Sequence, residues 1–536
     1  MKMANGVLLY LSVCTLPLCA LGASPHVPAS AAVAALAHAQ ALEKDKNADD
    51  VLASFYQAVE ADPDFLAAHD WLQQYLQDRT VEAYQQEKRD NGRAIKELRE
   101  LHKTIDAKYQ EWQKRFPESL GIQYAIAMRM SAKEDPNVRP YLLKLVERDP
   151  TNAKVYSMLG VDALISGDKN GAEEYMYKAT TLDPSNPRYA LAYAMHVEPA
   201  KRHEALRDVA KRFPNTDTGA SALYFLANDD FNDAQRIADL EQLRAEFPPE
   251  KFGWSADGMV HLFEAYVRVD PAKAIKLAQD MQTIKASTEW AGRVGLAQAF
   301  VEADKKLAAG KANESLALLD SLKPERHSEN IAMIERFKAR VMVQTGHTRE
   351  GYQALLAFQA KNPDDETRSA LQSMGERLHK TAAQVQGDIK AAVDAGAKPA
   401  PRFNLQQYTS DDSISLAKLR GKVVLLTFWF PGCGPCAEEF PHFEAVMRQF
   451  KHNKDVDYIG INIMRDQDTY VIPRVEKMGY SFTPLKGTDK VRKDFTVKGA
   501  PTNFVIDRRG RIVYQNFKID DAHGELMLQR MIESAL

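Results

Sequence analysis

Dipeptides that end in proline recur at a nearly constant interval along the first part of this 536-residue chain. Their first residues are separated by 33, 34, 30 and 34 positions along the series Phe116-Pro117, Asp149-Pro150, Asp183-Pro184, Phe213-Pro214 and Phe247-Pro248. A period near 34 is typical of a solenoid of helix–turn–helix units, in which proline ends a helix of each unit. The period therefore predicts an α-helical repeat array over residues 24–380.

The clearest copy of the repeat spans residues 153–184. Its matching positions are Tyr156, Leu159, Gly160, Ala163, Ala172, Met176, Ala179 and Pro184. Small residues such as Gly160 and Ala172 are required where the two helices of one unit cross closely. This segment resembles a tetratricopeptide repeat, as does a second copy at residues 332–363. The resemblance implies a groove that binds a peptide or protein, and an assembly scaffold is the alternative that the sequence leaves open.

The array gives way to a different pattern near residue 400. Residues 381–400 run through Ala- and Lys-rich helical sequence into the cluster Ala395-Gly396-Ala397-Lys398-Pro399-Ala400-Pro401. Glycine and proline together interrupt regular structure. We therefore expect a linker at 381–400 and a separate domain at 401–536, whose apolar and helical segments alternate in the α/β manner.

Two cysteines, Cys433 and Cys436, follow the apolar run at 423–430 and precede a helix-patterned stretch. The continuous apolar run predicts a strand in a sheet that is covered on both faces. A sulfur at the start of the following helix would be stabilised as a thiolate by unpaired amides and the helix dipole. The pattern predicts a redox-active disulfide with Cys433 as the nucleophile. The alternatives are a structural disulfide or a metal site, and we predict no metal.

The other two cysteines, Cys14 and Cys19, lie in a stretch that has the character of a secretory signal peptide at residues 1–23. We expect export across an inner membrane into an oxidising, periplasmic space. A lipid anchor at Cys19 is disfavoured, because Leu18 stands where the lipoprotein signal requires a small residue. An uncleaved signal anchor is the other alternative, although the apolar segment is shorter than the ~20 residues of a spanning helix.

The net charge of −3 is small for a chain of this length. Nucleic acid is therefore not predicted as a partner. The sequence contains neither a Walker-type phosphate loop nor a His-Glu-x-x-His zinc motif, and we predict no cofactor.

Three motifs in the C-terminal part occur in a familiar order, at residues 421–429, 433–441 and 499–502. They read Gly-Lys-Val-Val-Leu-Leu-Thr-Phe-Trp, Cys-Gly-Pro-Cys-Ala-Glu-Glu-Phe-Pro and Gly-Ala-Pro-Thr. Together they resemble the TlpA/ResA-type thioredoxin-like family over about residues 399–536. The resemblance implies an α/β thioredoxin fold and an extracytoplasmic thiol–disulfide oxidoreductase, typically a reductant. Its implied partners are a disulfide-containing client protein and a membrane or periplasmic electron donor.

The resemblance also implies roles for individual residues. Cys433 would attack the client disulfide and Cys436 would resolve the mixed disulfide. Glu439 would carry the proton of Cys436, with an ordinary first-turn helix carboxylate as the alternative. Pro501 matches a cis-proline that lets the backbone of Ala500 pair with an extended substrate.

Three further positions near the dithiol qualify this resemblance. Trp429 would lie beside the site and contact substrate, although a packing aromatic fits the sequence equally well. Thr427 stands where cytosolic thioredoxins have a buried acid, which makes Glu439 the expected substitute. Gly432 replaces the tryptophan that usually precedes the first cysteine, so we expect an exposed Cys433 sulfur.

Two other functions remain open at the sequence level. A peroxiredoxin-like peroxidase would require threonine three residues before its reactive cysteine, but Phe430 and Cys433 hold those positions. A non-enzymatic scaffold with a vestigial redox domain is the second alternative, and the intact dithiol argues against it.

Overall fold

The computed structural model describes residues 26–43, 48–90, 93–229, 232–284, 287–324, 328, 330–519 and 522–536. The predicted signal peptide at 1–23, with Cys14 and Cys19, lies outside these residues. Contacts divide the chain into two compact units, Met1–His196 and Val197–Leu536. Within the described ranges, no helix combines the length and apolar character that a membrane span requires.

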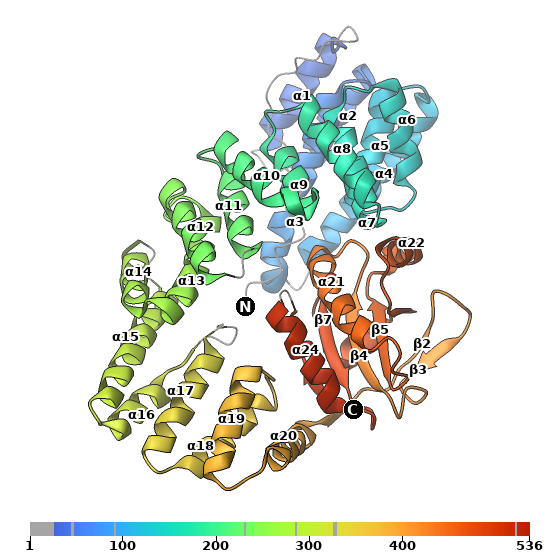
Figure 1. The fold of residues 1–536 in the computed structure, drawn as a ribbon. Coiled ribbons are helices and arrows are strands. Elements are labelled where there is room, and N and C mark those ends of the chain that lie inside the picture. Colours follow the sequence, from blue (N-terminus) through green and yellow to red (C-terminus); the bar gives the residue numbers. More distant parts are fainter. Residues whose placement is uncertain are drawn as a thin grey trace. The chain divides into compact units, whose positions relative to one another are not determined.

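The first unit is helical throughout its described part (Figure 1). Its helices are α1 (Ser30–Leu42), α2 (Ala48–Ala61), α3 (Leu66–Asp90), α4 (Arg93–Arg115), α5 (Leu120–Ala132), α6 (Val138–Arg148), α7 (Ala153–Ile165), α8 (Lys169–Leu182) and α9 (Pro187–His196). Successive helices pack against one another, which keeps most contacts local in the sequence.

The helices of the second unit continue this pattern. They are α10 (Pro199–Arg212), α11 (Asp217–Asp229), α12 (Asp233–Glu246), α13 (Gly253–Val269), α14 (Pro271–Ile284), α15 (Thr288–Ala308), α16 (Ala312–Ser321), α17 (Ile331–Gln344), α18 (Thr348–Gln359), α19 (Asp365–Arg377) and α20 (Ala382–Gly396). The predicted helical N-terminal region is thereby confirmed.

The helix pair expected at residues 153–184 corresponds to α7 and α8. Gly160 and Ala172 are both buried where these helices meet. A β-carbon on Gly160 would lie 2.8 Å from Cγ of Met176, so the crossing has no room for a larger residue. Asn152 and Asp168 cap the two helices through their side chains, accepting hydrogen bonds from Val155 and Gly171.

The segment expected as a linker carries regular structure of its own. Thr381 and Gln384 form a reciprocal capping box at the start of α20. The strand β1 (Lys398–Pro399) follows and pairs antiparallel with β8 (Arg511–Gln515). Val393 of α20 is buried in the same apolar cluster as Val423 and Leu425 of the sheet domain. This helix is therefore packed against the sheet domain.

The C-terminal domain is built on a six-stranded mixed sheet of order β1-β8-β7-β4-β5-β6. The central strand β4 (Val423–Trp429) pairs parallel with β5 (Val456–Asn462) and antiparallel with β7 (Thr502–Ile506). The remaining edge strand is β6 (Thr483–Lys486), and β2 (Asn404–Gln406) and β3 (Ser413–Ser415) form a separate hairpin. The helical elements of this domain are α21 (Gly434–Gln449), η2 (Arg465–Gln467), α22 (Asp468–Met478), α23 (Asp489–Asp494) and α24 (Ala522–Ala535).

Every residue of β4 is buried, which confirms the expected sheet with two covered faces. Val423, Leu425 and Trp429 join a cluster that contains both cysteines and residues of α21 and α24. Val424, Leu426 and Phe428 point to the opposite face and pack with Phe403, Phe495 and their neighbours. Figure 1 shows α21 and α24 beside β4 and β7. The sheet thus presents its first face to the helix that carries the dithiol.

Candidate active site

Cys433 and Cys436 form a disulfide at the junction of β4 and α21. Their Cα atoms are 5.3 Å apart. Cys433 is the N-cap of α21, and its sulfur accepts a hydrogen bond from the backbone N–H of Cys436 at 3.2 Å. Unpaired amides and the positive end of the helix dipole favour a negative charge at this position. The first sulfur therefore stands where a thiolate is stabilised once the disulfide is reduced.

Cys433 is 2% exposed and Cys436 is 1% exposed in this disulfide form. The expectation that glycine at position 432 exposes the first sulfur is therefore wrong for this state. Both cysteines belong to the apolar cluster on the first face of the sheet, and that packing covers the pair. The backbone N–H of Gly432 also donates to Oε1 of Gln467 at 2.6 Å, which ties the loop to a neighbouring segment.

Glu439 lies one helical turn after Cys436 and is completely buried. One carboxylate oxygen accepts from Nδ2 of Asn503 at 2.8 Å, and the other accepts from the backbone N–H of Ile519 at 2.8 Å. A buried carboxylate requires such donors, because burial without them is very costly. Burial and the nearby carboxylates of Glu444 and Glu439 raise the pKa of the Tyr458 phenol well above its usual value. Glu439 is thus a buried carboxylate with a donor at each oxygen, on the helix that carries the dithiol.

The Ala500–Pro501 peptide bond is cis and directly precedes β7. In the antiparallel pairing of β7 with β4, Thr502 lies opposite Phe428. The start of β7 and the end of β4 therefore lie at the same end of the sheet. The helix α21 and the dithiol begin at this end. Pro501 therefore directly precedes a strand that begins at the end of the sheet where α21 starts.

Trp429 is the last residue of β4 and is 1% exposed. Its ring packs edge-on against Phe482, Phe440 and Tyr480, with centroid distances of 5.0, 5.7 and 6.5 Å. Packing accounts for this burial, as in the alternative that the sequence left open, and the substrate contact stays a prediction.

Two polar residues of the site were not singled out from the sequence. Asn503 stands in an apolar strand directly after the third motif, which was an available signal. Gln467 lies in the turn η2, 35 residues from its partner Gly432, and no local pattern marks it. Asn462 fixes the segment that carries Gln467, because its Nδ2 donates to the Met464 carbonyl and to Asp468 at 3.0 and 2.9 Å.

Comparison with known proteins gives matches in the C-terminal part of the chain. The Redoxin family model matches residues 395–526. The thiol-disulfide oxidoreductase ResA of Bacillus subtilis is 32% identical over 125 residues, which cover 23% of this chain and 68% of that protein. The thiol:disulfide interchange protein HelX of Rhodobacter capsulatus is 32% identical over 136 residues, covering 24% of this chain and 73% of that protein.

Comparison with solved structures also gives matches. The crystal structure of a putative thiol:disulfide interchange protein DsbE from Chlorobium tepidum is 26% identical and has a TM-score of 0.24, covering 26% of this chain and 97% of that one. The identity to ResA and HelX extends over two thirds or more of each relative. Through its C-terminal domain, the chain therefore belongs to the ResA-like family of thiol–disulfide oxidoreductases.

Proposed function

We propose that this chain is an extracytoplasmic disulfide reductase whose working groups are Cys433 and Cys436. The observation that carries the proposal is the sulfur of Cys433 at the N-terminus of α21, with Cys436 and the carboxylate of Glu439 buried within the next turn. A helix N-terminus stabilises the attacking thiolate, and a buried second thiol is protected from other reactions.

The reaction moves two electrons from the dithiol to the client protein. The Cys433 thiolate attacks one sulfur of a client disulfide, forms a mixed disulfide and releases the other client sulfur as a thiolate. Cys436 then loses its proton and attacks the sulfur of Cys433. The bond between Cys433 and the client breaks, the Cys433–Cys436 disulfide forms, and the second client sulfur leaves as a thiolate that takes up a proton. An external dithiol donor at the membrane or in the periplasm reduces the pair again.

The neighbouring residues serve this reaction in different ways. Glu439 takes the proton of Cys436, since it is one turn away on the same helix and has no exposure to water. The cis bond before Pro501 leaves the backbone of Ala500 available to an extended client strand. Pro435 stiffens the first turn of α21 between the cysteines.

The helices before the redox domain recruit the client in this proposal. We assign tetratricopeptide-like repeats to residues 24–380, the connecting segment to 381–400 and the redox domain to 401–536. Support comes from the 34-residue period and from the close crossing of α7 and α8 at Gly160. The secretory-signal character predicted for residues 1–23 supports an oxidising compartment, in which a disulfide client exists.

The reduction potential of the Cys433–Cys436 pair tests the direction of the reaction. The mature chain is equilibrated in dithiothreitol or glutathione redox buffers, and free thiols are trapped. A value near or below that of thioredoxin, roughly −270 mV, is the result expected for a reductase. A value of about −120 to −180 mV belongs to oxidants and isomerases and would contradict the proposed direction.

Substitution of each cysteine tests the assigned order of attack. Cys433→Ser should abolish reduction of a model disulfide, whereas Cys436→Ser should accumulate a mixed disulfide that dithiothreitol releases. The double variant Cys433→Ser/Cys436→Ser cannot bond covalently to a client. If the array recruits the client, this variant should still retain it on a column in the absence of the disulfide link, and loss of retention would contradict that part of the proposal.

A further inference from the structure

Asn503 of β7 is one of the hydrogen-bond donors that hold the completely buried Glu439. Its Nδ2 donates to Oε2 of Glu439 at 2.8 Å and to the carbonyl of Phe517 at 3.0 Å. Asn503 is itself 0% exposed. Both partners are acceptors, so the amide nitrogen, and not the amide oxygen, must face them. The orientation of the amide is thus fixed by its neighbours.

The pairing of β7 with β4 fixes where this amide lies. Asn503 is opposite Thr427, and both side chains are on the face of the sheet that packs against α21. Glu439 reaches down from that helix to the same place, while its other oxygen is held by the N–H of Ile519. Three segments far apart in the sequence therefore converge on one carboxylate.

Asn503 destabilises the fold in a way that an apolar core residue would not. Its Oδ1 is buried and has no partner among the described residues, and the same is true of the hydroxyl of Thr427. An unpaired buried polar atom destabilises a fold, and an apolar side chain of similar size would avoid it. The benefit of asparagine at this position lies in its donor, which is directed at Glu439.

We propose that Asn503 is a positioning residue for the second half of thiol–disulfide exchange. Its amide keeps the Glu439 carboxylate charged and aligned, so that the carboxylate can take the proton of Cys436 before the Cys436 thiolate attacks Cys433. The inference rests on the proposed function, because it concerns a step of that reaction. Asn503 touches Glu439 and neither of the sulfurs, and it therefore acts through the carboxylate.

Other ionisable groups lie on the elements that pack near Glu439. On α21 these are Cys436 and Glu444, and on β5 the Tyr458 phenol, whose pKa the carboxylates raise further. His442 of α21 is paired with Glu525 of α24 at 2.7 Å. Lys518 lies next to Ile519 and is exposed. Asn503 is an uncharged side-chain donor to Glu439, so its substitution tests the pH dependence at Glu439 without changing the charge.

The test separates the two halves of the reaction. The fully reduced full-length protein is mixed with an excess of an aromatic disulfide such as 5,5′-dithiobis(2-nitrobenzoate), and release of the coloured thiolate is followed by stopped flow. The first release reports attack by Cys433, and the second reports attack by Cys436. The pH dependence of each phase is recorded for the wild type, for Asn503→Leu and for the control Thr427→Val.

Asn503→Leu should leave the first phase unchanged and slow the second by about tenfold near neutral pH, less than the ~10²–10⁴-fold effect of losing an acid–base group. Its half-maximal rate should move to higher pH, because a carboxylate that loses a donor to its charged form stays protonated longer. Thr427→Val removes a buried hydroxyl at the facing position without touching Glu439, and should match the wild type. Asn503→Ala removes the same donor with less bulk, should Asn503→Leu fail to fold.

A double-variant cycle distinguishes positioning from packing. In a Glu439→Gln background, Asn503→Leu should cause no further slowing of the second phase. Equal second-phase profiles for Asn503→Leu and the wild type would overturn the positioning role, as would additive effects in the cycle. Absence of both phases in the wild type would instead overturn the proposed function, so the two failures are separate.

Discussion

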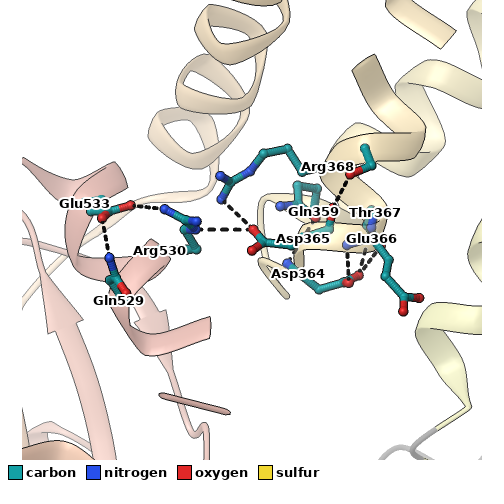
Figure 2. Close-up of polar contacts among 10 residues, drawn as sticks. Gln359, Asp364, Asp365, Glu366, Thr367, Arg368, Gln529, Arg530 and Glu533 are labelled. Atoms are coloured by element: carbon teal, nitrogen blue, oxygen red, sulfur yellow. Dashed lines mark hydrogen bonds and ion pairs between the residues drawn. The ribbon is translucent and has the colours of Figure 1, made fainter. Parts of the chain in front are cut away.

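Arg530 of α24 contacts Asp365 of α19, with Nε of the guanidinium 3.2 Å from a carboxylate oxygen (Figure 2). The two residues are 165 positions apart, and the contact joins the redox domain to the last helices before it. Arg530 is held from its own side by Glu533 at 2.8 Å, and Arg368 approaches the same Asp365 at 3.4 Å. Both members of the pair are partly exposed.

Breaking this pair should weaken the junction only modestly. Asp365→Asn keeps the size of the side chain and removes its charge, and we expect a loss of up to about 1 kcal/mol in the free energy of unfolding, as for other partly exposed ion pairs. Urea denaturation followed by circular dichroism measures it. The exposed pair Arg340–Asp304 is the control, and Asp304→Asn should have no measurable effect. Additive effects of Asp365→Asn and Arg530→Gln would show that the pair does not couple the two helices.

The conformation of the loop before the dithiol should depend on the hydrogen bond that Gln467 accepts. Gln467→Ala removes the acceptor for the N–H of Gly432, a partly buried hydrogen bond whose loss costs roughly 1 kcal/mol. We expect a several-fold slower attack by Cys433 on a small aromatic disulfide, because the loop that positions its sulfur is less constrained. Gln407→Ala is the control, since that side chain donates a hydrogen bond to the exposed Ser410 and not to the loop before the dithiol. Equal first-phase rates for all three proteins would contradict this role.

The elements around the dithiol could be predicted because their signals are local. The apolar run at 423–430 and the helix pattern after Cys436 each lie within a few residues of chain, and the structure has β4 and α21 there. Strand β6 was not predicted, since Pro484 interrupts its pattern. Proline cannot donate to a ladder and is tolerated here because β6 is an edge strand.

The contacts that complete the site join residues far apart in the sequence. Asn503 and Glu439 are 64 positions apart, and Gln467 and Gly432 are 35 apart. These sequence separations are much longer than the three- or four-residue spacing of helix neighbours or the two-residue spacing along a strand face. Local sequence patterns therefore carry no information about these pairs. The burial of Cys433 and Trp429 likewise depends on tertiary packing. The residue type at one position does not predict that packing.

The stability of the last helix pair before the redox domain should depend on pH through Asp388. Its carboxylate accepts from Nζ of Lys380 and from the hydroxyl of Tyr352, each at 2.7 Å, and these bonds hold the pKa of Asp388 below its ordinary value. A carboxyl with a lowered folded-state pKa contributes stability above its unfolded-state pKa of 3.8 and loses it as the pH falls through the folded-state value.

Asp388→Asn should therefore be less stable than the wild type at pH 7, by no more than about 1 kcal/mol because the carboxylate is partly exposed to solvent. The difference should shrink when the pH is lowered below 3.8 and vanish once the wild-type carboxyl is protonated. Urea midpoints at pH 7 and at a series of acidic values measure it. A difference that stays constant down to the lowest pH would contradict the assigned cause.

Close packing at Gly121 predicts a loss of stability when its side chain is enlarged. A β-carbon at this buried position of α5 would collide with the carbonyl oxygen of Pro63 and lie 2.8 Å from Cα of Asp64. The contact is backbone on backbone, and the N–H of Gly121 also donates to Asp64 at 2.9 Å. Since neither side can rotate away, Gly121→Ala must shift α5 against the turn between α2 and α3.

We expect Gly121→Ala to lower the free energy of unfolding by about 1–3 kcal/mol, as other overpacked sites do. Gly292 in α15 is the matched control, because it is exposed and a β-carbon there meets nothing within 4 Å. Gly292→Ala should raise the stability by roughly 0.5–1 kcal/mol, since alanine loses less backbone entropy in a helix than glycine. Urea denaturation of both variants measures the change in the free energy of unfolding, which should be negative for Gly121→Ala and positive for Gly292→Ala. A stabilising Gly121→Ala would show that α5 and this turn are not packed as described.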